Sequence, residues 1–336
     1  MARLLVTGGC GFIGSHLCEA LLAQGHAVRV LDDLSTGSQA NLAPGATLMI
    51  GNVEHPEDVR RAMEGIEGCF HLAAIASVQR CTEAWLASHH ANLSGTIAVL
   101  EGARVASRAR GRPVPVVYAS SAAIYGASSS GALEESVTPS PLSAYGADKL
   151  GCELHARVAG LVYGVPTLGL RFFNVFGPRQ DPRSPYSGVI SIFCERLSRG
   201  EPITIYGDGG QTRDFVFVED VVGALIAGIG VASPVGTVLN VCTGRATSVL
   251  KLAQLIASAC GTRAVMTYQP ARAGDIRQSV GSARNMRKAL ASPTPMALEA
   301  GIARVLEWSR AGSHPLAPLA VSPLSMPAWR GFVQNA

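Results

Sequence analysis

Residues 7–14 read TGGCGFIG, a glycine-rich stretch between an apolar run and a segment with helical periodicity. Gly9, Gly11 and Gly14 fit the spacing G-x-G-x-x-G, while Gly8, Gly11 and Gly14 fit G-x-x-G-x-x-G. Glycines permit a tight turn and let the backbone approach a pyrophosphate at the N-terminus of the following helix. A strand, this turn and a helix in that order predict a dinucleotide-binding unit.

An acidic residue follows at the position where such a unit uses one. Asp32 ends the run AVRVLD, 18 residues after Gly14. A carboxylate there can accept hydrogen bonds from both ribose hydroxyls of NAD, and it would repel a 2′-phosphate. The sequence therefore predicts NAD, rather than NADP, as the cofactor.

Apolar runs bounded by turn residues alternate with helical segments through the first half of the chain. These runs are LLVTGG, AVRVLDD, ATLMIGN, GCFHLAA, VPVVYASS and PTLGLRFFN. Short continuous apolar runs are typical of strands buried on both faces, and intervening helices indicate a doubly wound parallel sheet. We predict the α/β class, with a Rossmann-type sheet and a smaller C-terminal α/β lobe for the substrate.

The second half differs in texture, because a loop rich in proline, glycine and serine is followed by short helices and single strands. We expect the NAD-binding domain to comprise residues 1–173, rejoined by a helix and a strand at about 218–243. Residues 174–217 and 244–313 would form the substrate lobe. Repeated prolines exclude a regular helix in 314–336, which is expected to be an extended tail.

Composition excludes several classes of protein. The chain has 336 residues, 48% of them hydrophobic and 15% charged, and its net charge of +4 is not concentrated in any block. Nucleic acid is therefore not an expected partner. The eight cysteines form no C-x-x-C pair, so no metal site is expected. The absence of a signal-like start and of a long apolar run predicts a cytoplasmic protein with no membrane partner.

Two short motifs carry candidate chemistry. Ser120 and Ser121 end one predicted strand, and the stretch YGADK places Tyr145 and Lys149 four residues apart on one face of a predicted helix. A tyrosine phenol with an ordinary pKa of about 10 acts as a base near neutrality only when a neighbouring cation stabilises its anion. Lysine is rare in this chain, which makes its position beside a tyrosine notable.

Eight stretches together resemble the extended short-chain dehydrogenase/reductase family, and within it the UDP-hexose 4-epimerases of the UDP-glucose and UDP-N-acetylglucosamine type. They are TGGCGFIGSHL, LDDLSTG, FHLAA, SSAAIYG, YGADK, LRFFNVFGPRQDP, GDGGQTRDFVFVEDV and RAGDIRQS. The resemblance implies a catalytic centre of Ser121, Tyr145 and Lys149. It also implies that NAD takes the hydride from C4 of a UDP-sugar and that the NADH so formed returns it to the opposite face of the 4-keto intermediate, so that the enzyme is an isomerase.

Alanines at two further positions limit which reaction of the family this chain can catalyse. Related 4,6-dehydratases carry Asp-Glu where Ala122 and Ala123 stand here, and related decarboxylases carry Glu at the second position. Methyl groups there leave no acid–base pair for dehydration. The resemblance therefore implies epimerisation at C4 alone.

The resemblance also implies residues that contact the two ligands. Those for the cofactor are Gly8, Gly11, Phe12, Ile13, Gly14, Asp32, Asp33, Ser35, Thr36, Gly37, Asn52, Val53, Leu72, Ala73, Ala74, Asn92, Ser120, Tyr145, Lys149 and Phe172. Those for the substrate are Ser77, Ser121, Ala122, Tyr145, Asn174, Gly188, Val189, Thr204, Tyr206, Arg213, Arg272, Asp275 and Ser279. Arg213 and Arg272 would hold the diphosphate, because a guanidinium binds phosphate in a bidentate manner.

Several departures from the family pattern bear on affinity and specificity. Many relatives carry Asp where Asn52 stands, facing the adenine amine, and some 4-epimerases carry Tyr at Phe172 and Lys at Ala76. Ser279 falls at the position beside the sugar C2 substituent, where a tyrosine restricts relatives to UDP-glucose and UDP-galactose. Serine there implies that UDP-N-acetylglucosamine and UDP-N-acetylgalactosamine are also accepted.

Three alternatives stay open from the sequence. They are a UDP-uronic acid 4-epimerase, a net reductase, and a non-catalytic regulator that binds NAD. The family usually forms homodimers through two helices, which would here lie at about residues 92–108 and 145–163.

Overall fold

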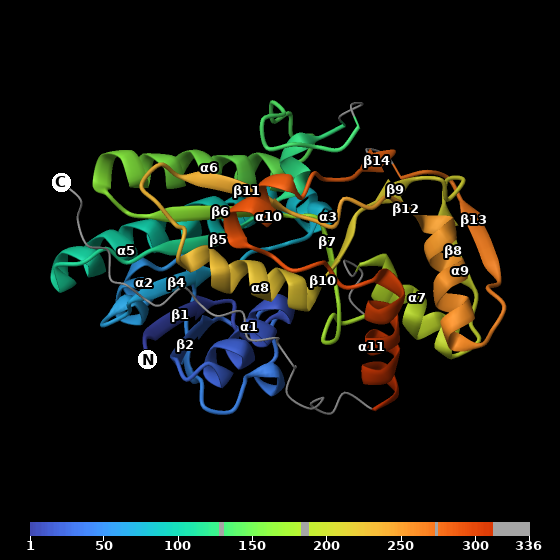
Figure 1. The fold of residues 1–336 in the computed structure, drawn as a ribbon, viewed down its shortest axis with the longest axis horizontal. Coiled ribbons are helices and arrows are strands. Elements are labelled where there is room, and N and C mark those ends of the chain that lie inside the picture. Colours follow the sequence, from blue (N-terminus) through green and yellow to red (C-terminus); the bar gives the residue numbers. More distant parts are fainter. Residues whose placement is uncertain (128–130, 183–187, 273–274, 312–336) are drawn as a thin grey trace.

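A seven-stranded sheet forms the centre of the molecule in the computed structural model, which describes residues 1–127, 131–182, 188–272 and 275–311 (Figure 1). The strand order is β11-β6-β5-β4-β1-β2-β3, and all neighbouring strands are parallel. The strands are β1 (Arg3–Thr7), β2 (Ala27–Asp32), β3 (Thr47–Ile50), β4 (Gly68–His71), β5 (Val116–Ser121), β6 (Thr167–Phe172) and β11 (Thr237–Val241). Because the order reverses between β1 and β4, the sheet is doubly wound, which confirms the predicted fold class.

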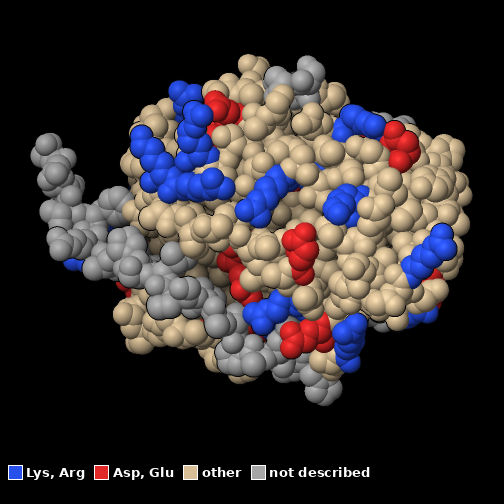
Figure 2. Space-filling view, turned by 45° about the vertical axis from the view of Figure 1, so that its right-hand side comes forward, with Lys and Arg blue, Asp and Glu red and all other residues tan. Residues whose placement is uncertain are grey.

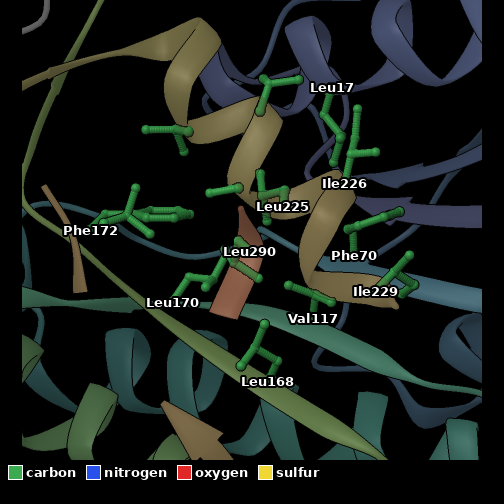
Figure 3. Packing of buried hydrophobic residues seen from close by; sticks show 14 of the residues in the cluster. Leu17, Phe70, Val117, Leu168, Leu170, Phe172, Leu225, Ile226, Ile229 and Leu290 are labelled. Carbon is green, nitrogen blue, oxygen red and sulfur yellow. The ribbon is translucent and has the colours of Figure 1, made fainter. Parts of the chain in front are cut away.

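Side chains of the strands alternate between two layers of helices. Leu4 and Val6 of β1 belong to the core on one side, and Leu5 belongs to the core on the other. Helices α1 (Phe12–Ala23), α8 (Val218–Ile229) and α10 (Arg284–Leu290) cover the first side. Helices α2 (Pro56–Met63), α5 (Gly95–Arg110) and α6 (Ala144–Tyr163) cover the second. Figure 3 shows Ile229 of α8 next to Phe70 and Val117 of the sheet, and Ile226 of α8 next to Leu17 of α1.

A separate hydrophobic core lies in the lobe at the right of Figure 1. Phe193, Ile203, Leu252 and Ile302 are among its buried members. The lobe elements are α7 (Val189–Ser198), β8 (Ile203–Tyr206), α9 (Val249–Cys260), β13 (Met266–Gln269) and α11 (Leu298–Arg310). Short ladders join it to the sheet domain: β7 (Asn174–Phe176) pairs with β10 (Phe215–Phe217), and β9 (Thr212–Arg213) lies between β12 (Thr247–Ser248) and β14 (Gln278–Ser279).

The remaining elements are short. They are α3 (Val78–Glu83), α4 (Trp85–His89), the π-helical turn η2 (His90–Ser94), and the 3₁₀ turns η1 (Gln39–Asn41) and η3 (Ala122–Tyr125). Within the described ranges, no helix has both the length and the apolar character that a membrane crossing requires. The tail expected at 314–336 lies outside the described residues.

The chain crosses between the two cores more than once. Residues near 218–243 form α8 and β11, and β11 pairs with β6 at the edge of the large sheet. Helix α10 packs against β11 and α8, so this part of 244–313 contributes to the core of the sheet rather than to that of the lobe. The sequence did not predict that return.

Most of the surface drawn in Figure 2 is uncharged, with basic and acidic side chains both present.

Candidate active site

Two glycines at the turn between β1 and α1 stand where a side chain would collide with the backbone. Gly8 has φ +72°, and a Cβ atom there would lie 2.8 Å from the backbone nitrogen of Ala73. A Cβ on Gly14 would lie 2.1 Å from the carbonyl oxygen of Gly8. Both positions therefore require glycine, and the N-terminus of α1 stays accessible to a ligand at close range.

Asp32 ties this turn to the end of β2. One carboxylate oxygen accepts the amide of Cys10 at 2.9 Å and the other accepts the amide of Leu34 at 2.9 Å. The side chain is 7% exposed. The carboxylate is thus fixed at the end of the strand, beside the turn, as the sequence predicts for a group that binds a ribose.

A buried histidine holds the ends of β1 and β4 together. The hydroxyl of Thr7 lies 2.7 Å from Nδ1 of His71, and Nε2 of His71 lies 3.0 Å from the hydroxyl of Thr96. Thr96 donates to the carbonyl of Asn92 at 2.6 Å, so Nε2 must carry the proton and donate to Thr96. Burial, and secondarily the charge of Lys149, lowers the pKa of His71 to about 3.

Through Thr7, this histidine positions Leu72 and Ala73, two of the predicted cofactor contacts. With its proton directed to His71, the Thr7 hydroxyl accepts the amides of Leu72 and Ala73, each at 3.2 Å. Sequence reasoning missed Thr7 and His71. The available signal was a histidine at the end of an otherwise apolar strand, immediately before the LAA motif.

The side chain of Asn92 forms hydrogen bonds with the backbone just after Ala73 and Ala74. Its side-chain oxygen accepts the amide of Ile75 at 2.8 Å and its nitrogen donates to the carbonyl of Ile75 at 3.3 Å. Asn92 therefore shapes the chain that follows Ala73 and Ala74. The oxygen of Asn52 is likewise engaged, because it accepts the amide of Glu54 at 2.9 Å.

The candidate catalytic residues come from β5 and α6. The ammonium of Lys149 donates to the carbonyl of Ala119 at 2.9 Å and lies 5.8 Å from the ring centre of Tyr145. Ser121 ends β5, and its hydroxyl accepts the amide of Ala123 at 3.1 Å, which caps η3. Gly146 allows the first turn of α6 to touch η3, since a Cβ there would lie 2.6 Å from the carbonyl oxygen of Ala123.

The other predicted cofactor residues occupy the same edge of the sheet. Parallel strands end on one edge, and this edge carries the ends of β1, β2, β3, β4, β5 and β6. The structure places the remaining predicted contacts at the start of α1 (Phe12, Ile13), in the loop after β2 (Asp33, Ser35, Thr36, Gly37), after β3 (Asn52, Val53) and at the end of β6 (Phe172).

Predicted substrate residues converge where the short ladders meet. Ser279 lies opposite Arg213 in the β9–β14 register, and the amide of Asp214 donates to the carbonyl of Ser279 at 3.0 Å. The amide of Asn174 donates to the carbonyl of Asp214 at 3.0 Å. Asn174, Arg213 and Ser279 therefore lie on three adjacent backbone segments, although they are far apart in the sequence.

Two basic residues of this group already have partners. Arg213 forms an ion pair with Asp275, and burial lowers the pKa of Arg213, opposed by the charge of Asp275. The guanidinium of Arg272 stacks on the ring of Tyr206 at 4.0 Å. Both arginines are thus oriented by groups that the sequence also predicted, and Thr204 lies on the same strand as Tyr206.

The last predicted substrate residues stand at helix starts. Ser77 caps α3 by accepting the amide of Arg80 at 3.1 Å, and Ala122 opens η3. Gly188 precedes α7, where Val189 is the first residue.

Comparison with known proteins gives a consistent picture. A family model described as the NAD dependent epimerase/dehydratase family matches residues 4–242. The UDP-glucose 4-epimerase of Mycolicibacterium smegmatis is 36% identical over 315 residues, covering 92% of this chain and 98% of that protein.

Solved structures agree in fold over nearly the whole chain. The Thermus thermophilus UDP-glucose 4-epimerase in complex with NAD superposes with a TM-score of 0.84 at 35% identity, covering 92% of this chain and 99% of that one. The UDP-N-acetylglucosamine 4-epimerase of Methanobrevibacter ruminantium, in complex with UDP-N-acetylmuramic acid, superposes with a TM-score of 0.86 at 31% identity. The match covers 93% of this chain and 99% of that one.

Proposed function

The chain belongs to the NAD dependent epimerase/dehydratase family, and from that premise we propose that it is an NAD-dependent isomerase acting on UDP-hexoses. It inverts the configuration at C4 of UDP-glucose or UDP-galactose through a transient 4-keto intermediate. Its relatives named UDP-glucose 4-epimerase and UDP-N-acetylglucosamine 4-epimerase support this assignment.

One observation carries the choice of reaction within the family. Ser121 lies at the end of β5, Lys149 of the neighbouring helix bonds to the same strand, and the residues after Ser121 are alanines that form η3. No carboxylate therefore stands at the two positions where dehydration needs an acid and a base. Proton and hydride transfer at C4 is the chemistry that these side chains can perform.

The residues present fit a bound NAD. Gly8 and Gly14 carry no side chains that would block the turn, and the fixed carboxylate of Asp32 suits the adenosine ribose. Leu72, Ala73 and Ala74 follow the strand end that Thr7 and His71 hold. When bound, NAD supplies a reversible hydride acceptor for C4 of the sugar.

The side chains of this protein handle the proton. Tyr145 as a phenolate accepts the proton of the C4 hydroxyl and returns it after the sugar has turned. Ser121 donates a hydrogen bond to the same oxygen and stabilises its developing charge. Lys149, held by the carbonyl of Ala119, places a positive charge 5.8 Å from the centre of the Tyr145 ring.

The substrate is held by residues of the lobe and of the ladders that join it to the sheet. We assign NAD to residues 1–173 with 218–243, and the sugar nucleotide to 174–217 and to the part of 244–313 outside α10. Arg213 and Arg272 bind the diphosphate, and the diphosphate competes with Asp275 for Arg213. Ser279, one ladder position from Arg213, leaves space beside C2 of the sugar for an acetamido group.

An apolar face supports a homodimer. Leu154, Val158, Leu161 and Val162 form a stripe along α6 and are each 47–65% exposed. Helix α5 lies beside α6 and adds Ile97, which is also exposed. A second copy presenting the same two helices would cover this face.

All eight cysteines are free thiols, which supports a place in the reducing cytoplasm.

The proposed activity is tested with UDP-galactose deuterated at C4. Because hydride leaves and returns within one site, the label should stay at C4 of the product, and no added NAD should be consumed. Loss of the label to solvent, or a 6-deoxy-4-keto product, would contradict the epimerase assignment. Parallel assays with UDP-glucuronic acid would detect the alternative uronic acid activity.

The role of Tyr145 is tested with Tyr145→Phe, which should abolish turnover while bound NAD and substrate remain, since only the proton-transfer group is removed. Tyr268→Phe is the matched control, because Tyr268 lies exposed on β13 of the lobe. Turnover and absorbance of bound cofactor are measured on the same samples. Activity of Tyr145→Phe within about tenfold of wild type would exclude Tyr145 as the base.

A further inference from the structure

A buried ion pair lies between α6 and the sheet, next to the catalytic strand. Arg171 of β6 donates from Nε to one carboxylate oxygen of Glu153 at 2.9 Å and from Nη2 to the other at 2.7 Å. The side chains are 5% and 7% exposed. Removing two charges from water is costly, and apolar residues of similar size often stabilise a core as well or better. Stability alone therefore does not account for this pair.

The pair is bonded to both sides of Ser121. The hydroxyl of Ser120 donates to Glu153 Oε1 at 2.5 Å, and Nη1 of Arg171 donates to the hydroxyl of Tyr125 at 2.8 Å. Tyr125 closes η3, the turn that Ser121 opens, and in turn donates to Asn240 at 2.7 Å. The backbone that presents Ser121 is thus fixed one residue before it and four residues after it.

Glu153 also shares a helix face with the proposed catalytic residues Tyr145 and Lys149. Tyr145, Lys149 and Glu153 are spaced four residues apart on α6 and so lie on one side of it. Lys149 bonds to the carbonyl of Ala119, and Glu153 bonds to the side chain of the next residue, Ser120. Residues on two successive turns of α6 therefore bond to Ala119 and Ser120 of β5, the two residues that precede Ser121.

We propose that Glu153 and Arg171 are positioning residues for epimerisation, which hold the Ser121 segment in register with the face of α6 that carries Tyr145 and Lys149. The inference rests on the proposed function, because it presupposes that Ser121 and Tyr145 act on the same C4 oxygen. Neither Glu153 nor Arg171 needs to touch substrate or cofactor. A shift of about 1 Å between reacting groups can cost about a hundredfold in rate.

The first test compares Glu153→Asp and Glu153→Gln with wild type. Asp keeps the charge but is one methylene shorter, so it cannot reach both Ser120 and Arg171. Gln keeps the length but leaves Arg171 unpaired. Both variants should retain bound NAD and a KM within about twofold, while kcat falls by about tenfold or more. Glu57→Gln, which removes an exposed ion pair with Arg60 on α2, is the matched control and should change neither.

A second variant separates positioning from folding. Glu153→Leu with Arg171→Met removes both charges, keeps the bulk, and should restore thermal stability relative to Glu153→Gln. Because Leu cannot accept the Ser120 hydroxyl, kcat should stay low. Recovery of kcat together with stability would overturn the inference, as would wild-type kcat in Glu153→Asp.

The same assays include Tyr145→Phe. If that variant retains turnover, the proposed catalytic centre is wrong whatever the Glu153 variants show. If it is inactive while the Glu153 variants have wild-type kcat, only the positioning role fails. Single-turnover reduction of bound NAD should be slowed in the Glu153 variants as much as kcat is, since positioning acts on the chemical step.

Discussion

Ser279 is a single residue whose size should decide which sugars react. It lies opposite Arg213, and its carbonyl accepts the amide of Asp214, whose own carbonyl accepts the amide of Asn174. The side chain at this position is therefore fixed by two ladders next to other residues proposed to line the sugar. A backbone held in this way cannot easily move aside for a larger side chain.

Ser279→Tyr should strongly reduce kcat/KM for UDP-N-acetylglucosamine while changing that for UDP-glucose little. The phenol ring would fill the space for the acetamido group, and steric exclusion acts on the larger sugar alone. The ratio of the two kcat/KM values is the quantity to measure, with Ser279→Ala as the size-neutral control. An unchanged ratio in Ser279→Tyr would show that the residue does not limit sugar size.

At the scale of elements, helix α1 is joined to the loop after β7 through polar groups, of which His16 is buried. His16 bonds through Nε2 to the carbonyl of Pro178 at 3.0 Å, and Glu19 pairs with Arg179 at 2.5 Å. Burial lowers the pKa of His16 to about 4, although the bond to Pro178 partly opposes this effect. The helix that begins at the glycine-rich turn is thus tied to the segment that leads into the lobe.

The low pKa of His16 predicts acid sensitivity of this junction. Unfolded histidine binds a proton below about pH 6.5, whereas folded His16 resists protonation until about pH 4, so the free energy of unfolding falls as the pH drops between these values. We expect wild type to lose about 1.4 kcal/mol more per pH unit than His16→Gln across this window.

Urea unfolding of both proteins at several pH values between about 6.5 and 4.5 measures that difference. Asp220, whose pKa burial raises to about 6, changes stability in the opposite direction. Because Asp220 is present in both proteins, its contribution cancels in the difference. Equal slopes for wild type and His16→Gln would mean that His16 does not stay neutral in the folded state.

The strands of the large sheet were predictable because each is a short apolar run with its own boundaries. The partners of Thr7, Asn92 and Glu153 were not, since each bond joins elements brought together only by strand register or helix packing. Ser120 and Glu153 illustrate this: they are 33 residues apart and meet because α6 lies on β5. The return of α10 to the sheet was missed for the same reason.

At the scale of the whole molecule, the stripe on α6 should govern assembly. Leu161→Arg places a charge in the middle of the apolar face and should convert a dimer into a monomer. Val265→Arg is the control, because Val265 is equally exposed but lies before β13 in the lobe. Light scattering after size-exclusion chromatography measures the mass of each. A monomeric wild type, or a dimeric Leu161→Arg, would contradict the proposed interface.

The pairing of β11 with β6 has a consequence for how the polypeptide is made. One edge strand of the sheet is Thr237–Val241, and it is translated only after the first lobe segments, α7 and β8. Until then β6 has an uncovered edge with free backbone donors and acceptors, which invites pairing with other nascent chains. A gene fragment ending near residue 173 should for this reason yield an aggregating product, because it lacks the strand that covers β6.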